Sequence, residues 1–420
     1  MISFRHMAVA KSDLGFRLVV LYLLLLLLTG FQNSQGHFNR HVAFFIFGDS
    51  LFDSGNNNYI KTTPEFQANF WPYGESYFDP PSGRFSNGRL IPDFIGDTYK
   101  SQTTANLSFF FQFLDYLFLI FPLLTAEFAG LPLIPAYLDP RYHNNGFLYG
   151  ANFASGGSGV LVETNAGFVV DLKTQLQYFY DLEKRFRKDL GGLKAQQLLS
   201  DAVYLFGCGV NDYAVLLSNN QSSHHHQQYV EMVIGNLTDV FKGILEKGGR
   251  KIGIATIPPL GCSPIARAQQ LGNTCNEELN TLASLHNRAL SKKMKELTKQ
   301  FEGFMCANYD LSTALAKRMR NPSNYGTRSF KVGDTACCGS GPFRGIFSCG
   351  GKRGIQEFEL CDNPDDYVFF DAPHPSEAAS RQFAQLFWDG DSNVTTPYNL
   401  KALFQGTYRL NLRYVTLLKQ

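Results

Sequence analysis

The stretch HVAFFIFGDSLFDSGNNNY, residues 41–59, opens with a run of six apolar residues (42–47) that is followed at once by Gly-Asp-Ser. A short apolar run that ends at Gly and Asp predicts a strand buried on both faces, as in a parallel sheet. Ser50 then follows the carboxyl end of that strand. It is either a nucleophile presented at a sheet edge or an ordinary turn residue, and only the rest of the chain can separate these two roles.

Four further apolar runs end in the same way, at residues 147–154, 202–209, 251–257 and 367–370. Long amphipathic segments separate them, and the clearest helices are predicted at 277–301 and at 228–249, where the second ends on glycine. Strands that alternate with helices predict an α/β fold: a three-layer α/β/α sandwich around a mostly parallel five-stranded sheet. In such folds the functional residues gather past the carboxyl ends of the strands.

The composition allows a large core and excludes some partners. The chain has 420 residues, of which 44% are hydrophobic, and its formal net charge is only +2. A nearly neutral chain without long runs of one charge gives no reason to expect a nucleic-acid partner.

The first 36 residues have the pattern of a secretory signal peptide. Basic residues precede the apolar run LVVLYLLLLLL at 18–28, and a polar, small-residue segment follows it. The alternative is a membrane anchor, but the run is shorter than the roughly 20 residues that a spanning helix needs. We therefore predict a signal peptide at 1–36, secretion to the extracellular space or cell wall, no stable membrane span, and a single domain at 37–420.

The cysteines and glycosylation sequons agree with an oxidising route. None of the cysteines shows the C-x-x-C spacing of a zinc site, so disulfides are predicted, with Cys262–Cys275 and pairs within 337–361 as candidates. All eight lie beyond the signal peptide, at Cys208, Cys262, Cys275, Cys306, Cys337, Cys338, Cys349 and Cys361. The N-x-S/T sequons lie at Asn106, Asn220, Asn236 and Asn393.

Residues 96–125 do not fit the pattern of the rest. This segment is rich in Phe and Leu but has no clean periodicity, and its deletion joins the flanks into one continuous apolar helix face. We interpret it as a retained intron translated in frame. A lipid-binding lid and a membrane hairpin are the alternatives, and sequencing the mature transcript distinguishes them.

Four short blocks carry residues suited to acyl transfer. A serine nucleophile needs a base and a group that orients the base, and Asp371 with His374 three residues later supplies both. An oxyanion needs backbone N–H groups and an amide, which the block FASGGSG, with Gly156 and Gly157, and the block GCGVNDY, with Asn211, can provide. Each block taken alone is also compatible with an ordinary turn.

Taken together and in this order, FIFGDSLFDSGNNN, NFASGGSG, GVNDY and DAPHPSE resemble the plant GDSL esterase/lipases of the SGNH hydrolase superfamily. The resemblance covers about residues 42–388 apart from 96–125, and it implies a flavodoxin-like fold. It also implies that Ser50 is the nucleophile, His374 the base and Asp371 its orienting partner. The oxyanion hole would consist of the N–H groups of Ser50 and Gly156 and the amide of Asn211, with Gly157 as the neighbouring alternative. The absence of G-x-S-x-G around Ser50 separates the chain from the α/β-hydrolases.

The predicted activity is hydrolysis of a carboxyl ester through an acyl-enzyme, without a metal or an organic cofactor. The histidines at 224–226 are read as solvated surface, because no matching ligand spacing accompanies them. Two alternatives stay open: a catalytically idle binding or modifier protein, and an acyltransferase that uses the same triad. The acyl-ester substrate itself, the chain-length preference and the oligomeric state are not determined by the sequence.

Overall fold

Residues 42–95, 133–142, 146–218, 225–325 and 329–406 are described by the computed structural model of the chain. The predicted signal peptide at 1–36 and the segment 96–125 lie outside these ranges, as do Asn106, Asn220 and His224. The fold and the site are therefore built from the described ranges alone.

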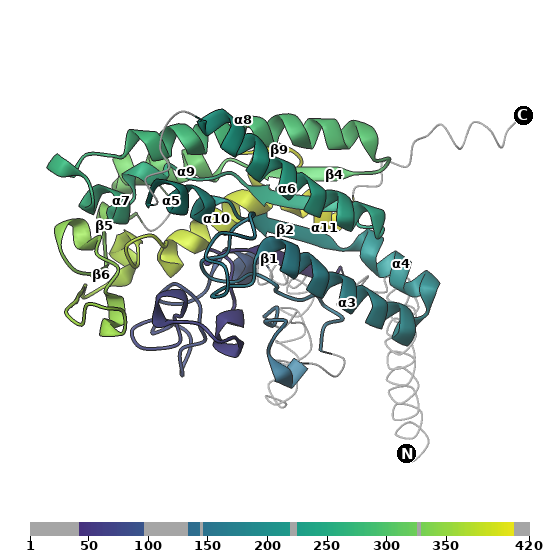
Figure 1. Ribbon diagram of the computed structural model, residues 1–420, viewed down its shortest axis with the longest axis horizontal. Coiled ribbons are helices and arrows are strands. Elements are labelled where there is room, and N and C mark those ends of the chain that lie inside the picture. The colour runs from purple at the N-terminus through teal and green to yellow at the C-terminus, as the bar shows by residue number, and fades with distance from the viewer. Residues whose placement is uncertain (1–41, 96–132, 143–145, 219–224, 326–328, 407–420) are drawn as a thin grey trace, which may run out of the picture. The chain divides into compact units, whose positions relative to one another are not determined.

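The centre of the fold is a five-stranded sheet with the order β1-β2-β3-β4-β9 (Figure 1). The first four strands are parallel and β9 pairs antiparallel with β4, so the prediction of a mostly parallel sheet is confirmed. The strands are β1 (Phe44–Gly48), β2 (Val203–Gly207), β3 (Lys251–Ala255), β4 (Met305–Tyr309) and β9 (Thr395–Pro397).

Two of the five predicted strands were placed wrongly. Residues 147–154 lie along the free edge of β1 and form only isolated bridges, because Gly150 adopts a φ of +117° and interrupts a regular ladder. Hydrogen bonds from Phe44 N–H to the Tyr149 carbonyl (2.9 Å) and from Ile46 N–H to the Ala151 carbonyl (3.0 Å) still attach the segment. Within 367–370, β8 (Tyr367–Phe369) pairs instead with β5 (Val332–Ala336) in a separate two-stranded sheet. With 147–154 counted as an irregular edge, the spatial order corresponds to the flavodoxin-like arrangement.

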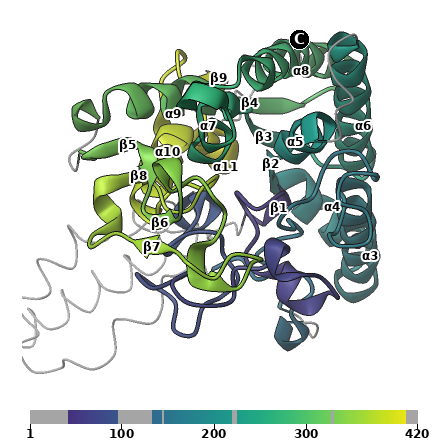
Figure 2. The same cartoon turned by 60° about the vertical axis from the view of Figure 1, so that its left-hand side comes forward.

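Helices cover both faces of the central sheet, as Figure 2 shows. Alternate residues of β1 point to opposite faces: Phe45 and Phe47 belong to one core cluster, and Phe44 and Ile46 to the other. Each of these four side chains is at most 1% exposed, and burying each contributes about 1.5–3 kcal/mol. The first cluster is packed under α3 (Leu172–Leu190), α4 (Gly192–Asp201), α5 (Val210–Ser218), α6 (His226–Glu246) and α8 (Glu277–Gln300). The second is packed under α9 (Leu311–Arg320), α10 (Glu377–Asp389) and α11 (Leu400–Gln405).

The long amphipathic helices form where the periodicity predicts them. Helix α8 spans Glu277–Gln300 and buries Leu282, Met294 and Leu297 of the predicted stripe. Helix α6 is followed by Gly248 at a φ of +106°, whose N–H is donated to the Leu245 carbonyl (3.1 Å), and so it ends on glycine as expected. Local sequence decides these helices because their apolar faces repeat at the helical period.

The flanks of the segment 96–125 were predicted to form one helix when joined, and residues 91–95 on the first flank are helical in the structure. Ile91, Phe94 and Ile95 are buried in the same cluster as Phe44 and Ile46 of β1. This part of the predicted helix therefore packs beside β1, although its continuation at 126–130 lies outside the described residues.

Three disulfides link Cys262 to Cys275, Cys337 to Cys361 and Cys338 to Cys349. The predicted pairing of Cys262 with Cys275 and the presence of pairs within 337–361 are confirmed. The remaining two cysteines, Cys208 and Cys306, for which the sequence predicted no particular pairing, are buried free thiols. Among the residues that the structure describes, no helix is long and apolar enough to span a membrane.

Candidate active site

Ser50, His374 and Asp371 lie in one line of hydrogen bonds. The distance from His374 Nε2 to Ser50 Oγ is 2.7 Å, and His374 Nδ1 lies 2.7 Å and 2.9 Å from the two carboxylate oxygens of Asp371. Ser50 follows β1, whereas Asp371 and His374 follow β8, so two separate sheets supply the three side chains. The structure thus brings together the predicted nucleophile, base and orienting carboxylate at hydrogen-bonding distance.

The turn that carries Asp371 and His374 is fixed by its own backbone. Phe370 N–H is donated to the His374 carbonyl (2.8 Å), and His374 N–H is donated to Asp371 Oδ1 (2.9 Å). Ser376 then caps α10 by accepting the Ala379 N–H at 3.2 Å. The Asp-x-x-His spacing is therefore a tight turn between a strand and a helix, and it places the imidazole ring directly beside the carboxylate.

The turn that carries Ser50 depends on close contact between neighbouring strands. Gly48 adopts a φ of +140°, and a Cβ atom at this position would lie 2.0 Å from the Gly207 carbonyl oxygen of β2. The Gln175 side chain on α3 accepts the Gly48 N–H (2.9 Å) and donates to its carbonyl (2.8 Å). Only glycine fits here, and the strand can therefore turn sharply and present Ser50 past the sheet edge.

Asn211 lies in the first turn of α5, just beyond β2. Its Nδ2 donates one proton to the Ser158 carbonyl at 2.9 Å, and an amide nitrogen carries a second proton for another acceptor. The adjacent Asp212 accepts the N–H groups of Val160 (2.9 Å) and Leu161 (3.0 Å). These contacts hold the glycine-rich loop against α5, beside the pocket that contains Ser50.

The backbone N–H of Gly156, which the sequence predicted to be an oxyanion donor, has another acceptor in the structure. It is donated to Asp53 Oδ2 at 2.8 Å, and this single backbone donor is thereby used inside the protein. Gly157, the alternative considered from the sequence, lines the same pocket as Ser50 and Asn211. Its φ is +81°, and a Cβ atom there would lie 2.3 Å from the Phe66 ring. The turn at 155–158 therefore presents Gly157 rather than Gly156 to the pocket.

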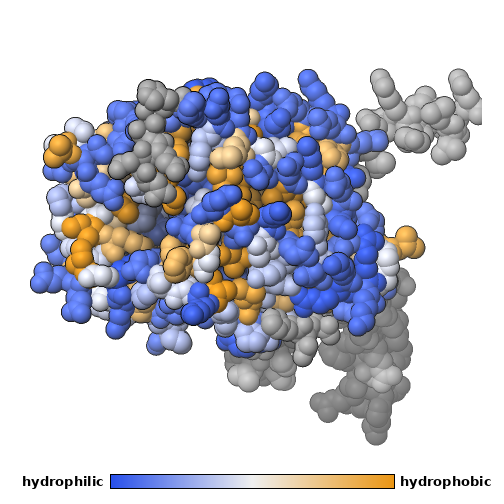
Figure 3. All heavy atoms as spheres, in the orientation of Figure 1, coloured by the Kyte–Doolittle hydropathy of each residue, from blue (hydrophilic) through white to orange (hydrophobic). Residues whose placement is uncertain are grey.

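A cavity of about 620 Å³ opens beside Ser50 and His374. Figure 3 shows apolar side chains around a hollow on the face that carries α5 and α7 (Pro264–Ala268). The cavity is bordered by α5, α7, the first turns of α8 and α9, and the loop at 258–263. Most of the lining side chains are apolar, among them Leu51, Phe66, Val215, Leu279, Leu315 and Phe347.

Two residues beside the triad had no signal in the sequence. Tyr73 donates its hydroxyl proton to Asp371 Oδ2 at 2.7 Å, and Arg353 contacts Tyr73 in turn. Neither belongs to a motif or a periodic element, and they lie 298 and 18 positions from Asp371 in the chain. No local pattern could have revealed them.

Asp49, the residue before Ser50, is a buried carboxyl group. Its Oδ1 accepts the Leu51 N–H at 3.0 Å, whereas Oδ2 has no hydrogen-bond partner among the described residues. Burial is the main cause that raises the pKa of Asp49 to about 7, and the nearby Asp212 and Asp53 add to it. The folded protein therefore binds a proton here more tightly than the unfolded chain, in which the pKa of an aspartate is about 3.9.

This difference predicts a pH-dependent stability. The contribution of Asp49 is fully present below about pH 4 and is lost as the pH rises towards 7, because the raised pKa belongs to the folded state. We expect Asp49→Asn to raise the melting temperature at pH 8 by roughly 2–5 °C and to change it much less at pH 4.5. Calorimetry of both proteins at the two pH values measures the effect. Asp334→Asn is the control: its carboxylate is half-exposed and pairs with Arg267 at 3.0 Å, so that variant should change the melting temperature little at either pH.

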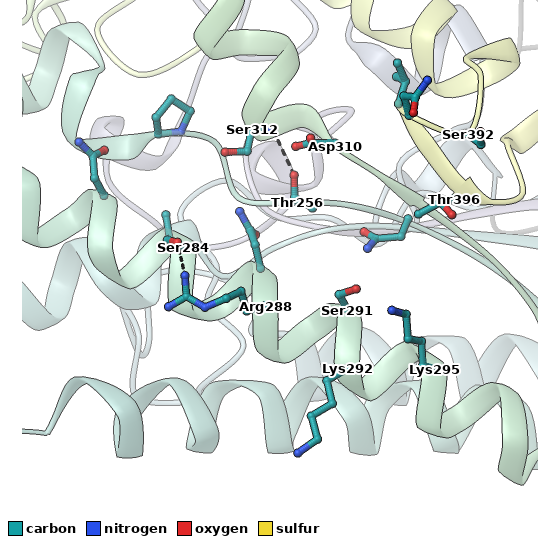
Figure 4. Close-up of a pocket in the computed structure, with 17 residues that line it drawn as sticks. Thr256, Ser284, Arg288, Ser291, Lys292, Lys295, Asp310, Ser312, Ser392 and Thr396 are labelled. Carbon is teal, nitrogen blue, oxygen red and sulfur yellow. Dashed lines mark hydrogen bonds between the residues drawn. The ribbon is translucent and has the colours of Figure 1, made fainter.

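A second cavity, of about 680 Å³, lies along α8, near β4 and the 392–396 segment (Figure 4). Its lining is largely polar, and some of these groups bond to one another: Ser312 N–H donates to Thr256 Oγ1 (3.1 Å), and Arg288 donates to Ser284 Oγ (2.7 Å). None of the predicted catalytic residues lines it. The residues predicted to catalyse acyl transfer, Ser50, Asn211 and His374, line the first cavity instead.

His226 is the last residue of the run of three histidines and the first residue of α6. Its Nε2 lies 2.8 Å from Oε1 of Glu278, which is in the first turn of α8. Among the residues that the structure describes, no group of three or more His, Cys, Asp or Glu side chains is arranged to hold a metal ion. His226 thus contributes to helix packing at this point.

Comparison with known proteins places this fold and site in a class. The chain belongs to the GDSL-like lipase/acylhydrolase family, which it matches over residues 44–387. It is 53% identical over 400 residues to a "GDSL lipase" of Tanacetum cinerariifolium, with 95% of this chain and 97% of that protein covered. It is 45% identical to "GDSL esterase/lipase 1" and 44% identical to "GDSL esterase/lipase 5" of Arabidopsis thaliana. Those alignments cover 86% and 87% of this chain and 90% and 88% of the relatives. The chain is accordingly a carboxylic ester hydrolase of the esterase/lipase type.

Proposed function

We propose that the chain is a secreted serine esterase/lipase in which Ser50, His374 and Asp371 form the catalytic triad. The observation that carries the proposal is the continuous set of contacts from Asp371 through His374 to Ser50 Oγ, which opens into the apolar cavity. Secretion is supported by the signal-like segment 1–36 and by the three disulfides, which persist in oxidising compartments.

In this mechanism Ser50 Oγ attacks the ester carbonyl carbon while His374 Nε2 takes the hydroxyl proton. Asp371 holds the other ring nitrogen and stabilises the imidazolium. The tetrahedral intermediate collapses to an acyl-enzyme on Ser50, and the alcohol leaves with the proton from His374. Water activated by His374 then releases the acid and restores Ser50.

The oxyanion that forms on the carbonyl oxygen needs donors on the pocket side of Ser50. We assign this role to the N–H groups of Ser50 and Gly157 and to the Asn211 amide, with Gly157 in place of Gly156. The Asn211 side chain supports this assignment. One of its two amide hydrogens is donated to the Ser158 carbonyl, and the second remains to donate to the oxyanion.

The lining of the cavity supports an uncharged acyl ester as the substrate. Among the described residues that line it there is no lysine or arginine to pair with an anionic group, whereas Glu65 and Asp49 are present. Leu, Val, Phe and Pro side chains instead form an apolar surface against which an alkyl or aryl chain can pack. Removing such a chain from water stabilises the complex by about 0.8 kcal/mol for each buried CH₂ group.

Covalent trapping tests the proposal. A fluorophosphonate probe should add its mass once to the purified, folded protein, and peptide mapping should find the adduct on Ser50. Prior incubation with a hydrolysable p-nitrophenyl ester should slow the labelling, and stopped-flow absorbance should show a burst of p-nitrophenol from acyl-enzyme formation. An unlabelled folded protein, or an adduct on another residue, would refute the triad.

Asn211→Ala is expected to lower kcat by about 10²–10³-fold with little change in KM, because the amide binds the oxyanion only in the transition state. Steady-state hydrolysis of a p-nitrophenyl ester measures the loss. Gln269→Ala is a matched control, since this amide lines the same cavity on α7's side and should leave kcat close to that of the parent protein. Equal effects in the two variants would contradict the assignment.

A further inference from the structure

Behind the triad lie two polar side chains that are almost completely removed from solvent. Tyr73 is 0% exposed and contacts Asp371, and Arg353 is 4% exposed and contacts Tyr73. Tyr73 comes from the loop after β1, and Arg353 follows the short turn at Cys349–Gly351. A buried guanidinium is costly unless its charge and its donors are matched, so its position calls for an explanation.

The hydrogen bonds form one unbroken line into the active site. Arg353 Nη1 donates to the Tyr73 hydroxyl oxygen at 2.8 Å, and the Tyr73 hydroxyl donates to Asp371 Oδ2 at 2.7 Å. The line then continues from Asp371 through His374 to Ser50. Five side chains from distant parts of the chain are thereby joined end to end.

The chemistry of the end group sets the direction of every bond in the line. A guanidinium can only donate, so the Tyr73 oxygen must accept from it and must turn its own proton towards Asp371. Burial and the negative charge of Asp371 raise the pKa of Tyr73 well above its usual value, and the phenol therefore keeps that proton. Asp371 then receives donors on both oxygens, and His374 Nδ1 must carry a proton. His374 Nε2 is consequently the bare nitrogen that faces the Ser50 hydroxyl.

Arg353 is itself anchored from several sides. Its guanidinium donates to the carbonyl oxygens of Cys349 (3.1 Å), Gln67 (2.6 Å) and Pro64 (3.1 Å), and it lies 3.9 Å from the centre of the Phe347 ring. Cys349 is held by its disulfide to Cys338. All three of these acceptors are neutral carbonyl groups. The carboxylate to which Arg353 is connected by hydrogen bonds is Asp371, and Tyr73 makes that connection.

We propose that Tyr73 and Arg353 are positioning residues for ester hydrolysis. They keep the Asp371 carboxylate in the plane of the His374 ring and partly balance its negative charge. They thereby hold His374 in the tautomer that can accept the Ser50 proton. This inference rests on the proposed triad. Neither residue touches the ester; both act through Asp371. Three other charged groups lie near the residues of this line: Asp49 beside Ser50, Glu65 in the cavity lining, and Glu377, which is paired with Arg89 at 2.7 Å. The pKa of Glu65 is lowered mainly by the Thr63 hydroxyl and also by the charge of Arg353, so Tyr73→Phe, which keeps Arg353, is the cleaner test of the effect on His374.

Tyr73→Phe tests the proposal because it removes one hydroxyl and keeps the ring. We expect kcat/KM for a p-nitrophenyl ester to fall about 3- to 10-fold, mainly through kcat, which is the size of effect expected for the net loss of one ordinary hydrogen bond. The negative charge of Asp371 is then less dispersed and favours the imidazolium form of His374. The acid limb of the pH profile of kcat/KM should therefore move to higher pH, by about half a unit or more.

Tyr204→Phe is the matched control. Tyr204 is also 0% exposed and also loses one hydrogen bond, from its hydroxyl to the Leu199 carbonyl (2.9 Å), but it lies in the helix-covered core. It should lower the melting temperature by a similar amount and leave the pH profile in place. If Tyr73→Phe shows the same kinetics and pH profile as Tyr204→Phe, the proposal is wrong.

Substitutions at Arg353 complete the test. Arg353→Met should shift the acid limb in the same direction as Tyr73→Phe, and the double variant should lose less than the product of the two single effects, because both act on Asp371. Arg353→Lys, which keeps a charged donor, should recover part of the loss. Multiplicative effects without a pH shift would indicate a purely structural role. A parent protein without esterase activity, or activity that survives Ser50→Ala, would instead refute the triad itself.

Discussion

Replacing Ser50 with alanine is expected to lower kcat for ester hydrolysis by about 10⁵–10⁶-fold, down to the rate that binding and the oxyanion donors alone sustain. The hydroxyl is the only group on this side chain, and it lies 2.7 Å from the nitrogen that would take its proton. No acyl-enzyme can form without it. The loss should therefore appear in kcat, while KM and the melting temperature stay close to those of the parent protein.

The comparison that makes this result specific is Ser263→Ala. Ser263 lines the same cavity, but its hydroxyl donates to the Leu260 carbonyl at 2.7 Å and has no contact with His374 among the hydrogen bonds of the described residues. It should keep nearly full activity and full fluorophosphonate labelling. Residual activity of Ser50→Ala above about one-tenth of the parent rate would exclude Ser50 as the nucleophile, given the size of the effect expected.

Asp371→Asn is expected to lower kcat by about 10⁴-fold with little change in fold. The carboxylate accepts three donors: the His374 backbone N–H, His374 Nδ1 and the Tyr73 hydroxyl. An amide of the same shape has one accepting oxygen and one donating nitrogen. With its nitrogen at the Oδ1 position, the amide faces His374 Nδ1 and favours the tautomer that cannot take the Ser50 proton. With its nitrogen at the Oδ2 position, it faces the proton of the Tyr73 hydroxyl, and that hydrogen bond is lost instead.

Steady-state kinetics and thermal unfolding of Asp371→Asn measure this effect. Asp334→Asn provides the matched substitution at a half-exposed carboxylate, which pairs with Arg267 at 3.0 Å and does not line the cavity. That variant should remain fully active. If Asp371→Asn stays within tenfold of the parent rate, Asp371 does not orient the base.

Local patterns were sufficient for the elements whose side chains repeat at a regular period. The strand β1 follows from four consecutive buried apolar residues, and α6 and α8 follow from apolar faces at the helical spacing. The block residues Ser50, Asn211, Asp371 and His374 were identified from short motifs, because each motif is a strand end or a tight turn whose shape is set within a few residues. The strand β4 was missed, since Met305–Tyr309 is short and contains the polar Asn308.

The errors arise where a distant segment decides the conformation. Residues 147–154 have the composition of a strand, but the φ of Gly150 and its contact with the Phe44 carbonyl break the ladder along β1. Gly156 and Gly157 are equivalent in the sequence. Asp53, 103 positions away, takes the N–H of the first and leaves the second to line the cavity.

The sequence by itself determined the class of enzyme and the helices and strands whose periodicity is local, and it was enough to predict the residues of the proposed triad. Only the tertiary structure showed that the Gly156 N–H is donated to Asp53, that Ser50 and His374 line a largely apolar cavity, and that Tyr73 and Arg353 extend the line of hydrogen bonds from Asp371. The physical reason is the range of the interactions. Periodicity and turn chemistry act within a few residues, whereas a buried hydrogen bond such as that from Tyr73 to Asp371 joins positions 298 residues apart and exists only when the chain is folded.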